Sequence, residues 1–137
     1  MILNLDQTTA HCAQEMVRNV NADNRALMDT LERLVTKTLG VLQEQGVYAM
    51  MLFLFSRSSD EKKIAPCIRE PLYQLLKCLP AFVEHENLTG FHEETAVNNV
   101  LSFFSDHVCQ DLDTLMLVRD MFEQALIYAR FGAKAEG

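Results

Sequence analysis

Two histidines and three glutamates lie close together in the second half of the sequence, and their side chains are of the types that bind metal ions. They are His85, Glu86, His92, Glu93 and Glu94. A metal site on one helix needs ligands three or four residues apart, as in H-E-x-x-H, and this spacing is missing here. Adjacent residues such as His92 and Glu93 diverge by roughly 100° around a helix. We therefore expect a solvated turn and no bound metal.

The thiols form no reactive motif either. Cysteines occur at positions 12, 67, 78 and 109, with no C-x-x-C pair. Cys12, Cys78 and Cys109 lie among apolar residues, where a free cysteine behaves as a small hydrophobic side chain. His107 and Cys109 are two residues apart, so they do not face each other on a helix, and no glycine-rich phosphate loop is present. The sequence predicts reduced structural thiols, no cofactor and no catalytic residues.

The net charge of −7 is unevenly distributed along the chain. Residues 1–56 carry four basic and six acidic groups, residues 57–80 carry five and three, residues 81–113 carry none and seven, and residues 114–137 carry three of each. A negative net charge of this size argues against indiscriminate binding to nucleic acid or to an anionic membrane. Because the acidic excess is concentrated in residues 81–113, it leaves local binding of an anion elsewhere possible.

A basic cluster at Arg57, Lys62, Lys63 and Arg69 is the candidate for such binding. Lysine and arginine side chains gathered on one edge can contact the phosphates of a nucleic acid. The same residues are also compatible with a solvated loop in which pairs of the Asp60–Lys63 type contribute little. The residues alone leave both interpretations open.

Apolar residues recur at helical spacing along the whole chain, and 49% of the residues are hydrophobic. We expect one all-α domain over residues 1–137, a compact helical bundle of five to seven helices. The expected helices cover residues 5–20, 25–45, 47–55, 71–79, 93–108 and a last segment from Asp111 or Asp113 to near Gly132, and residues 57–63 are expected to form a polar loop.

Several local signals support these boundaries. Gly46 is placed either as a helix C-cap or as a sharp junction between two helices. Residues 47–55 are apolar on every side, which favours a buried helix, although periodicity alone also allows a strand. Pro66 and Pro71 disfavour a continuous helix through this region, and Pro71 suits a first helical turn. Asn4, Asp23 and Asn24 are candidate N-caps.

The location of the protein follows from two further features. The chain begins MILNLDQTTAHCAQEM, without the basic flank and continuous apolar stretch of a signal peptide. Its longest apolar run has nine residues, whereas a membrane-spanning helix needs about 20. We expect a cytoplasmic protein that does not contact a membrane.

Three stretches of the sequence resemble the small subunit of type III-B CRISPR effector complexes, the Cmr complex. The first joins Leu31–Leu39 (LERLVTKTL) to Gln45–Arg57 (QGVYAMMLFLFSR), as a helix, a short polar-glycine step and an apolar helix that ends in a basic residue. The second, Glu123–Lys134 (EQALIYARFGAK), is similar to the closing helix of that family. Asp6-Gln7 fits its first helix. A small subunit of a neighbouring type III subtype fits nearly as well.

This resemblance implies a non-catalytic helical subunit of an RNA-guided antiviral ribonucleoprotein. Such subunits stack along the crRNA–target RNA duplex, contact the backbone and large subunits and further copies of themselves, and hold RNA through its phosphates. They use no cofactor, metal or small-molecule substrate. By position in the family motifs, Arg57, Arg130 and Lys134 are expected to contact RNA. Charge clustering adds Lys62, Lys63 and Arg69.

A second class of function is a helical protein–protein adaptor or regulatory domain unrelated to nucleic acid. Methionine side chains adapt to varied partners when they are exposed. The residues that could supply such a surface are Met50, Met51, Met116 and Met121, together with the acidic segment 81–113.

Overall fold

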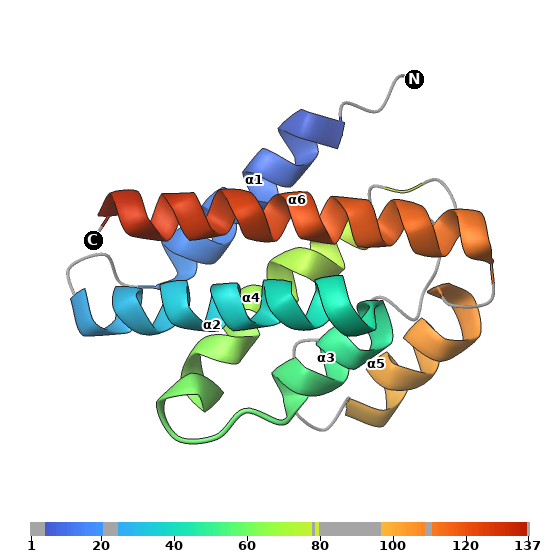
Figure 1. The fold of residues 1–137 in the computed structure, drawn as a ribbon, viewed down its shortest axis with the longest axis horizontal. Helices are drawn as coiled ribbons and strands as arrows, with labels where there is room; N and C mark the ends of the chain where they lie inside the picture. Colours follow the sequence, from blue (N-terminus) through green and yellow to red (C-terminus); the bar gives the residue numbers. More distant parts are fainter. Residues whose placement is uncertain (1–4, 21–24, 78, 80–96, 109–110, 137) are drawn as a thin grey trace.

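The computed structural model of this chain describes residues 5–20, 25–77, 79, 97–108 and 111–136 (Figure 1). The described chain forms α1 (Leu5–Asn19), α2 (Arg25–Gln45), α3 (Val47–Phe55), α4 (Asp60–Leu76), α5 (Val97–Phe103), a π-helical turn at Phe104–Val108, and α6 (Leu112–Glu136). No strand occurs within these ranges. The all-α fold with five to seven helices is therefore confirmed, and the strand alternative for residues 47–55 is excluded.

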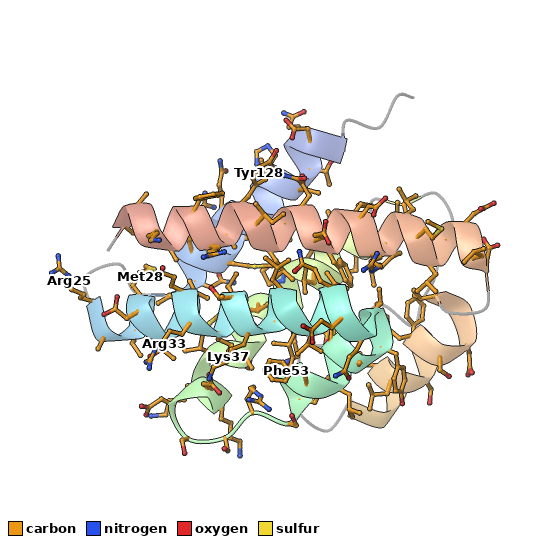
Figure 2. All side chains as sticks on the ribbon, viewed as in Figure 1. Arg25, Met28, Arg33, Lys37, Phe53 and Tyr128 are labelled. Carbon is orange, nitrogen blue, oxygen red and sulfur yellow. The ribbon has the colours of Figure 1, made fainter. Side chains whose placement is uncertain are left out.

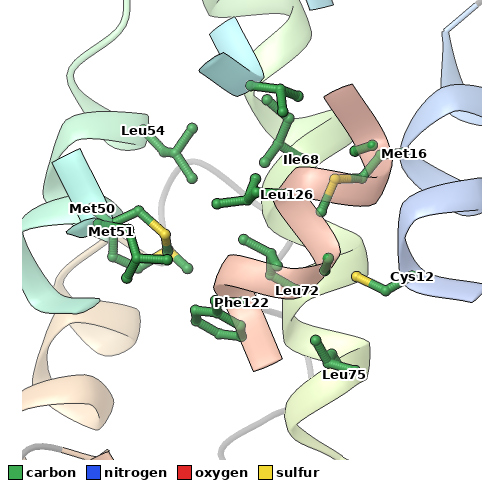
Figure 3. Packing of buried hydrophobic residues seen from close by; sticks show 14 of the residues in the cluster. Cys12, Met16, Met50, Met51, Leu54, Ile68, Leu72, Leu75, Phe122 and Leu126 are labelled. Atoms are coloured by element: carbon green, nitrogen blue, oxygen red, sulfur yellow. The ribbon is translucent and has the colours of Figure 1, made fainter. Parts of the chain in front are cut away.

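Helix α6 packs against both α1 and α2, and it runs along α2 in the opposite direction (Figure 1). Its Phe122 and Leu126 are fully buried. In Figure 3 these two side chains lie between the methionines of α3 on one side and α4 and α1 on the other. Burial of such side chains contributes roughly 1.5–3 kcal/mol each, so α6 supplies a large part of the core that it shares with α1 and α2.

Gly46 makes the junction between α2 and α3 as a single residue. Its φ of 97° and ψ of −175° are sparsely accessible to residues with a Cβ. Its N–H donates to the Leu42 carbonyl at 3.0 Å, and its carbonyl accepts the N–H of Met50 at 3.1 Å. The glycine thus ends one helix and starts the next, as the sharp-junction alternative predicts.

Helix α3 is not buried on every side, which corrects the expectation for residues 47–55. Val47, Met50 and Leu54 face the core, while Tyr48 and Leu52 are 39% and 48% exposed. The helix packs on α2 and α4 and also contacts α5, the π-helical turn and α6. Within the described part of the chain, the side that carries Tyr48 and Leu52 is left partly open to solvent.

The burial of three methionines disagrees with the methionine surface that the adaptor hypothesis expects. Met50, Met51 and Met121 are buried, and Met116 is exposed. The buried three fill the core beside α6, where an unbranched, polarisable side chain adapts to the space between helices. They therefore cannot form a surface for a partner.

Helix α4 is continuous from Asp60 to Leu76 with Pro66 and Pro71 inside it, so the expected break there is wrong. Residues 60–63 form its first turn and do not belong to a loop. A proline in a helix interior costs about 3 kcal/mol or more. The buried stripe that contains Ile64, Ile68 and Leu72 offsets this cost by packing on α1 and α2.

The last helix begins as predicted and continues further than predicted. The Asp111 carboxylate accepts the backbone N–H of Thr114 at 3.3 Å and its hydroxyl at 2.6 Å, which caps α6. The helix passes Gly132 and ends at Glu136. A Cβ at Gly132 would lie 3.2 Å from Cγ2 of Val17, so this glycine allows α1 to approach closely.

Part of the expected helix at residues 93–108 is confirmed as α5 and the π-helical turn. Some predicted features lie outside the described residues. These are the caps at Asn4, Asp23 and Asn24, the thiols of Cys78 and Cys109, residues 93–96, and the metal-ligand candidates His85, Glu86, His92, Glu93 and Glu94.

Candidate nucleic-acid interface

Helix α2, the turn between α3 and α4, and the first turn of α4 carry five basic side chains that we call the basic edge. Its members are Arg33 and Lys37 of α2, Arg57 of the turn, and Lys62 and Lys63 of the first turn of α4. In Figure 2, Arg33 and Lys37 point to the same side of α2, toward the start of α4. Arg33, Lys37, Lys62 and Lys63 are exposed, so they are accessible to an anion from solvent.

Arg57 is the most rigidly held member of the basic edge. Its guanidinium carbon lies 3.7 Å from the centre of the Phe53 ring. Its Nε donates to the Phe53 carbonyl at 3.0 Å and its Nη2 to the Ser56 hydroxyl at 3.1 Å. Each guanidinium nitrogen therefore has a protein acceptor, since Nη1 donates to Glu61, and the second N–H of Nη1 and of Nη2 is left for another acceptor; 23% of the side chain is exposed. The guanidinium fork suits the oxygens of a phosphate.

Glu61 links the two helices at the centre of the basic edge. Its carboxylate accepts the Lys37 ammonium at 2.8 Å and the Arg57 guanidinium at 3.3 Å. The hydrogen bond from Lys37 is the largest influence and lowers the pKa of Glu61; partial burial opposes it, and Arg57 adds to the lowering. Glu61 therefore positions both cations while neutralising part of their charge.

Glu61→Gln is expected to lower the free energy of unfolding by about 0.2–1 kcal/mol at neutral pH. Because the folded state lowers the pKa of Glu61, its ion pairs stabilise the protein above the ordinary carboxyl pKa of about 4.3. This contribution is lost as the pH falls through the folded-state pKa. Urea titrations of the wild type and the variant from neutral to acid pH should therefore converge. Glu44→Gln removes the same charge at an exposed position of α2 and should keep the free energy of unfolding at neutral pH within about 0.5 kcal/mol of the wild type.

Arg69 does not belong to the basic edge, which corrects the sequence expectation. It is 4% exposed, and its guanidinium carbon lies 4.1 Å from the centre of the Phe55 ring. Its Nε and Nη1 have no hydrogen-bond partner among the described residues. Continuous helix through α4 places Arg69 on the same face as buried Ala65 and Tyr73, four residues to either side. Burial raises the pKa of the nearby Tyr73, and the positive charge of Arg69 opposes this increase.

Arg130 and Lys134 are exposed, one turn apart, on the last part of α6. Figure 1 draws that end of α6 far from the turn between α3 and α4. The structure therefore does not bring these two residues together with Arg57, Lys62 and Lys63. They form a separate pair of exposed cations.

Arg33 and Lys37 were not singled out from the sequence. Their spacing of four residues on the polar side of a helix was the available signal. Residues 1–56 have a net charge of −2, so a sum over the segment conceals them. Only the packing of α4 against α2 shows that they lie beside residues 57–63.

No group of three or more His, Cys, Asp or Glu side chains in the described part of the chain could hold a metal ion. Cys12 is buried, as expected, and Cys67 is half-buried; both are free thiols. Burial and then the charge of Glu70 raise the pKa of Cys67, which disfavours the reactive thiolate.

No family model, curated protein or solved structure matches this chain. Among the helices described, none has both the length and the apolar character needed to cross a membrane. Function must therefore be inferred from the geometry of the basic edge and from the sequence motifs.

Proposed function

We propose that this protein is a non-catalytic subunit of a type III RNA-guided effector ribonucleoprotein, and that it holds RNA through its phosphates. The observation that carries this proposal is the basic edge, in which Arg57 is fixed on Phe53 and shares the Glu61 carboxylate with the exposed Lys37. Contacts from lysine and arginine to phosphates position a protein on RNA without reading its sequence. The resemblance to the Cmr small subunit supplies the class of assembly.

The net charge of the chain determines how such binding works. A protein of charge −7 attracts RNA weakly overall, so the free protein should bind it with low affinity that decreases steeply with salt. Several copies along one RNA strand would raise the effective concentration of each contact. Inside an assembly, each copy then needs only a few phosphate contacts. Its neighbours there would be the backbone and large subunits and other copies of the chain.

Co-expression with the genomic neighbours, followed by native mass spectrometry, tests the assembly. The expected result is a particle that contains guide RNA and more than one copy of this chain. Purification of the neighbours as a guide-RNA particle that lacks this chain would contradict the proposal.

Lys62→Glu/Lys63→Glu is expected to weaken binding of a fluorescein-labelled single-stranded RNA roughly tenfold. Each lost phosphate contact should also reduce the slope of log K against log salt by about 0.7. Fluorescence anisotropy measures both quantities. Glu61→Gln should act in the opposite direction and raise the affinity, because Lys37 and Arg57 lose their competing carboxylate.

The matched control is Arg18→Glu/Arg119→Glu, which changes the net charge by the same amount outside the basic edge. It should leave the affinity within about twofold of the wild type. An equal loss of affinity in both double variants would show that only the net charge matters, and the assignment of RNA contacts to the basic edge would be lost.

A protein–protein adaptor is the second candidate, and the start of α6 is the observation that favours it. Leu112 and Met116 are 67% and 56% exposed and lie one turn apart, beside Leu117 at 37%. Exposed apolar side chains that are grouped together mark interaction sites. An adaptor would purify with protein partners in the absence of RNA, and those complexes would resist both nuclease treatment and the Lys62→Glu/Lys63→Glu change.

A further inference from the structure

Helices α1 and α4 enclose a cavity of about 470 Å³ on the surface of the domain, which we call the α1–α4 groove. Its lining includes His11, Cys12 and Glu15 of α1 and Glu70, Gln74 and Leu75 of α4. Successive lining residues are one, three or four positions apart on each helix, so each helix contributes one side of the groove. The volume lies within the range of about 300–1,000 Å³ that is typical of small-molecule sites.

The floor of the α1–α4 groove is apolar. Cys12 and Leu75 are 6% and 2% exposed, and Pro71 of α4 is also buried. Pro71 lacks a backbone N–H, so it adds no donor to the floor. A ligand that occupies the groove must therefore place an apolar part against these three residues.

The rim of the groove is acidic on both helices. Glu15 of α1 and Glu70 of α4 are exposed and line the same cavity. Arg18 pairs with Glu15 from outside the lining, whereas Glu70 has no ion pair among the residues described. His11 and Gln74 add further polar groups to the rim. The charges of the rim are complementary to a cation.

We infer that the α1–α4 groove binds a small organic cation with an aliphatic stem, of the polyamine class. Its ammonium groups would pair with Glu70 and Glu15, and its methylene groups would cover Cys12, Pro71 and Leu75. Apolar stems packed below a charged head are a common way to satisfy such mixed surfaces. The groove shares no residue with the basic edge, so this inference stands independently of RNA binding.

Isothermal titration calorimetry with spermidine tests the inference on the full chain at constant ionic strength. Glu70→Gln is expected to weaken spermidine binding about tenfold by loss of a charge-assisted hydrogen bond; Glu15→Gln should weaken it less, because Arg18 already pairs with Glu15. Glu44→Gln removes the same charge from an exposed position outside the groove and should leave the affinity unchanged. All three positions are exposed, so the folded state should survive each substitution.

Two measurements separate a built site from a counter-ion effect. Amide chemical-shift changes on adding spermidine should be confined to α1 and α4, and magnesium ions at equal charge should not reproduce them. Equal losses of affinity in Glu44→Gln and Glu70→Gln, or identical shifts with magnesium, would overturn the inference. Glu70→Gln should keep the RNA affinity of the wild type, so failure here and failure of the proposed function are distinguishable.

Discussion

Phe122→Ala is expected to reduce the free energy of unfolding by about 3–5 kcal/mol, which is the usual cost of truncating a buried aromatic side chain. Phe122 is fully buried in α6, and the centre of its ring lies 6.2 Å from that of Phe104. In Figure 3 it lies in the middle of the core, between α3 and α4. Loss of the ring removes apolar burial and leaves a cavity that several helices would have to close together. Urea denaturation followed by circular dichroism measures the change.

Phe131→Ala is the matched control, because it makes the same substitution in the same helix at a side chain that is 66% exposed. It should change the free energy of unfolding by no more than about 0.5 kcal/mol. Similar losses in the two variants would contradict the assignment of Phe122 to the core and of Phe131 to the surface.

The helices that sequence analysis located well are those whose ends carry a backbone signal. Gly46 separates α2 from α3 because glycine accepts a conformation that other residues avoid, and Asp111 starts α6 because its carboxylate satisfies a free N–H. Helix α4 was not predictable in this way. The local cost of Pro66 and Pro71 is a property of the sequence, but the packing that offsets it depends on helices far away in the chain.

The same difference explains the candidate site. Arg57, Lys62 and Lys63 were found because they are close in the sequence, and they are close in space as well. Arg69 was misplaced, because the phase of a continuous α4 turns it into the interior beside Phe55. Lys37 was missed, because its contact with Glu61 spans 24 residues. Charge counting finds local clusters, whereas an interface depends on helix phase and helix pairing.

Gly46→Ala is expected to destabilise the protein by about 1–3 kcal/mol through the backbone alone. At φ 97° and ψ −175° an alanine is strained, although its Cβ would meet no atom within 4 Å. The strain should appear as a lower urea midpoint with an unchanged m-value, since the surface exposed on unfolding stays the same. It should also be additive with Phe131→Ala, because no shared contact couples the two sites.

Gly40→Ala, six residues earlier in the chain, should change the free energy of unfolding in the opposite direction. Gly40 lies inside α2, and a Cβ there also meets no atom within 4 Å. Alanine in a helix interior is favoured over glycine by about 0.5–1 kcal/mol, so this variant should be more stable than the wild type. The two substitutions add the same methyl group to open space and differ in backbone conformation. If Gly46→Ala were as stable as Gly40→Ala, the α2–α3 junction would not depend on a glycine conformation, and a continuous helix across residue 46 would be the better description.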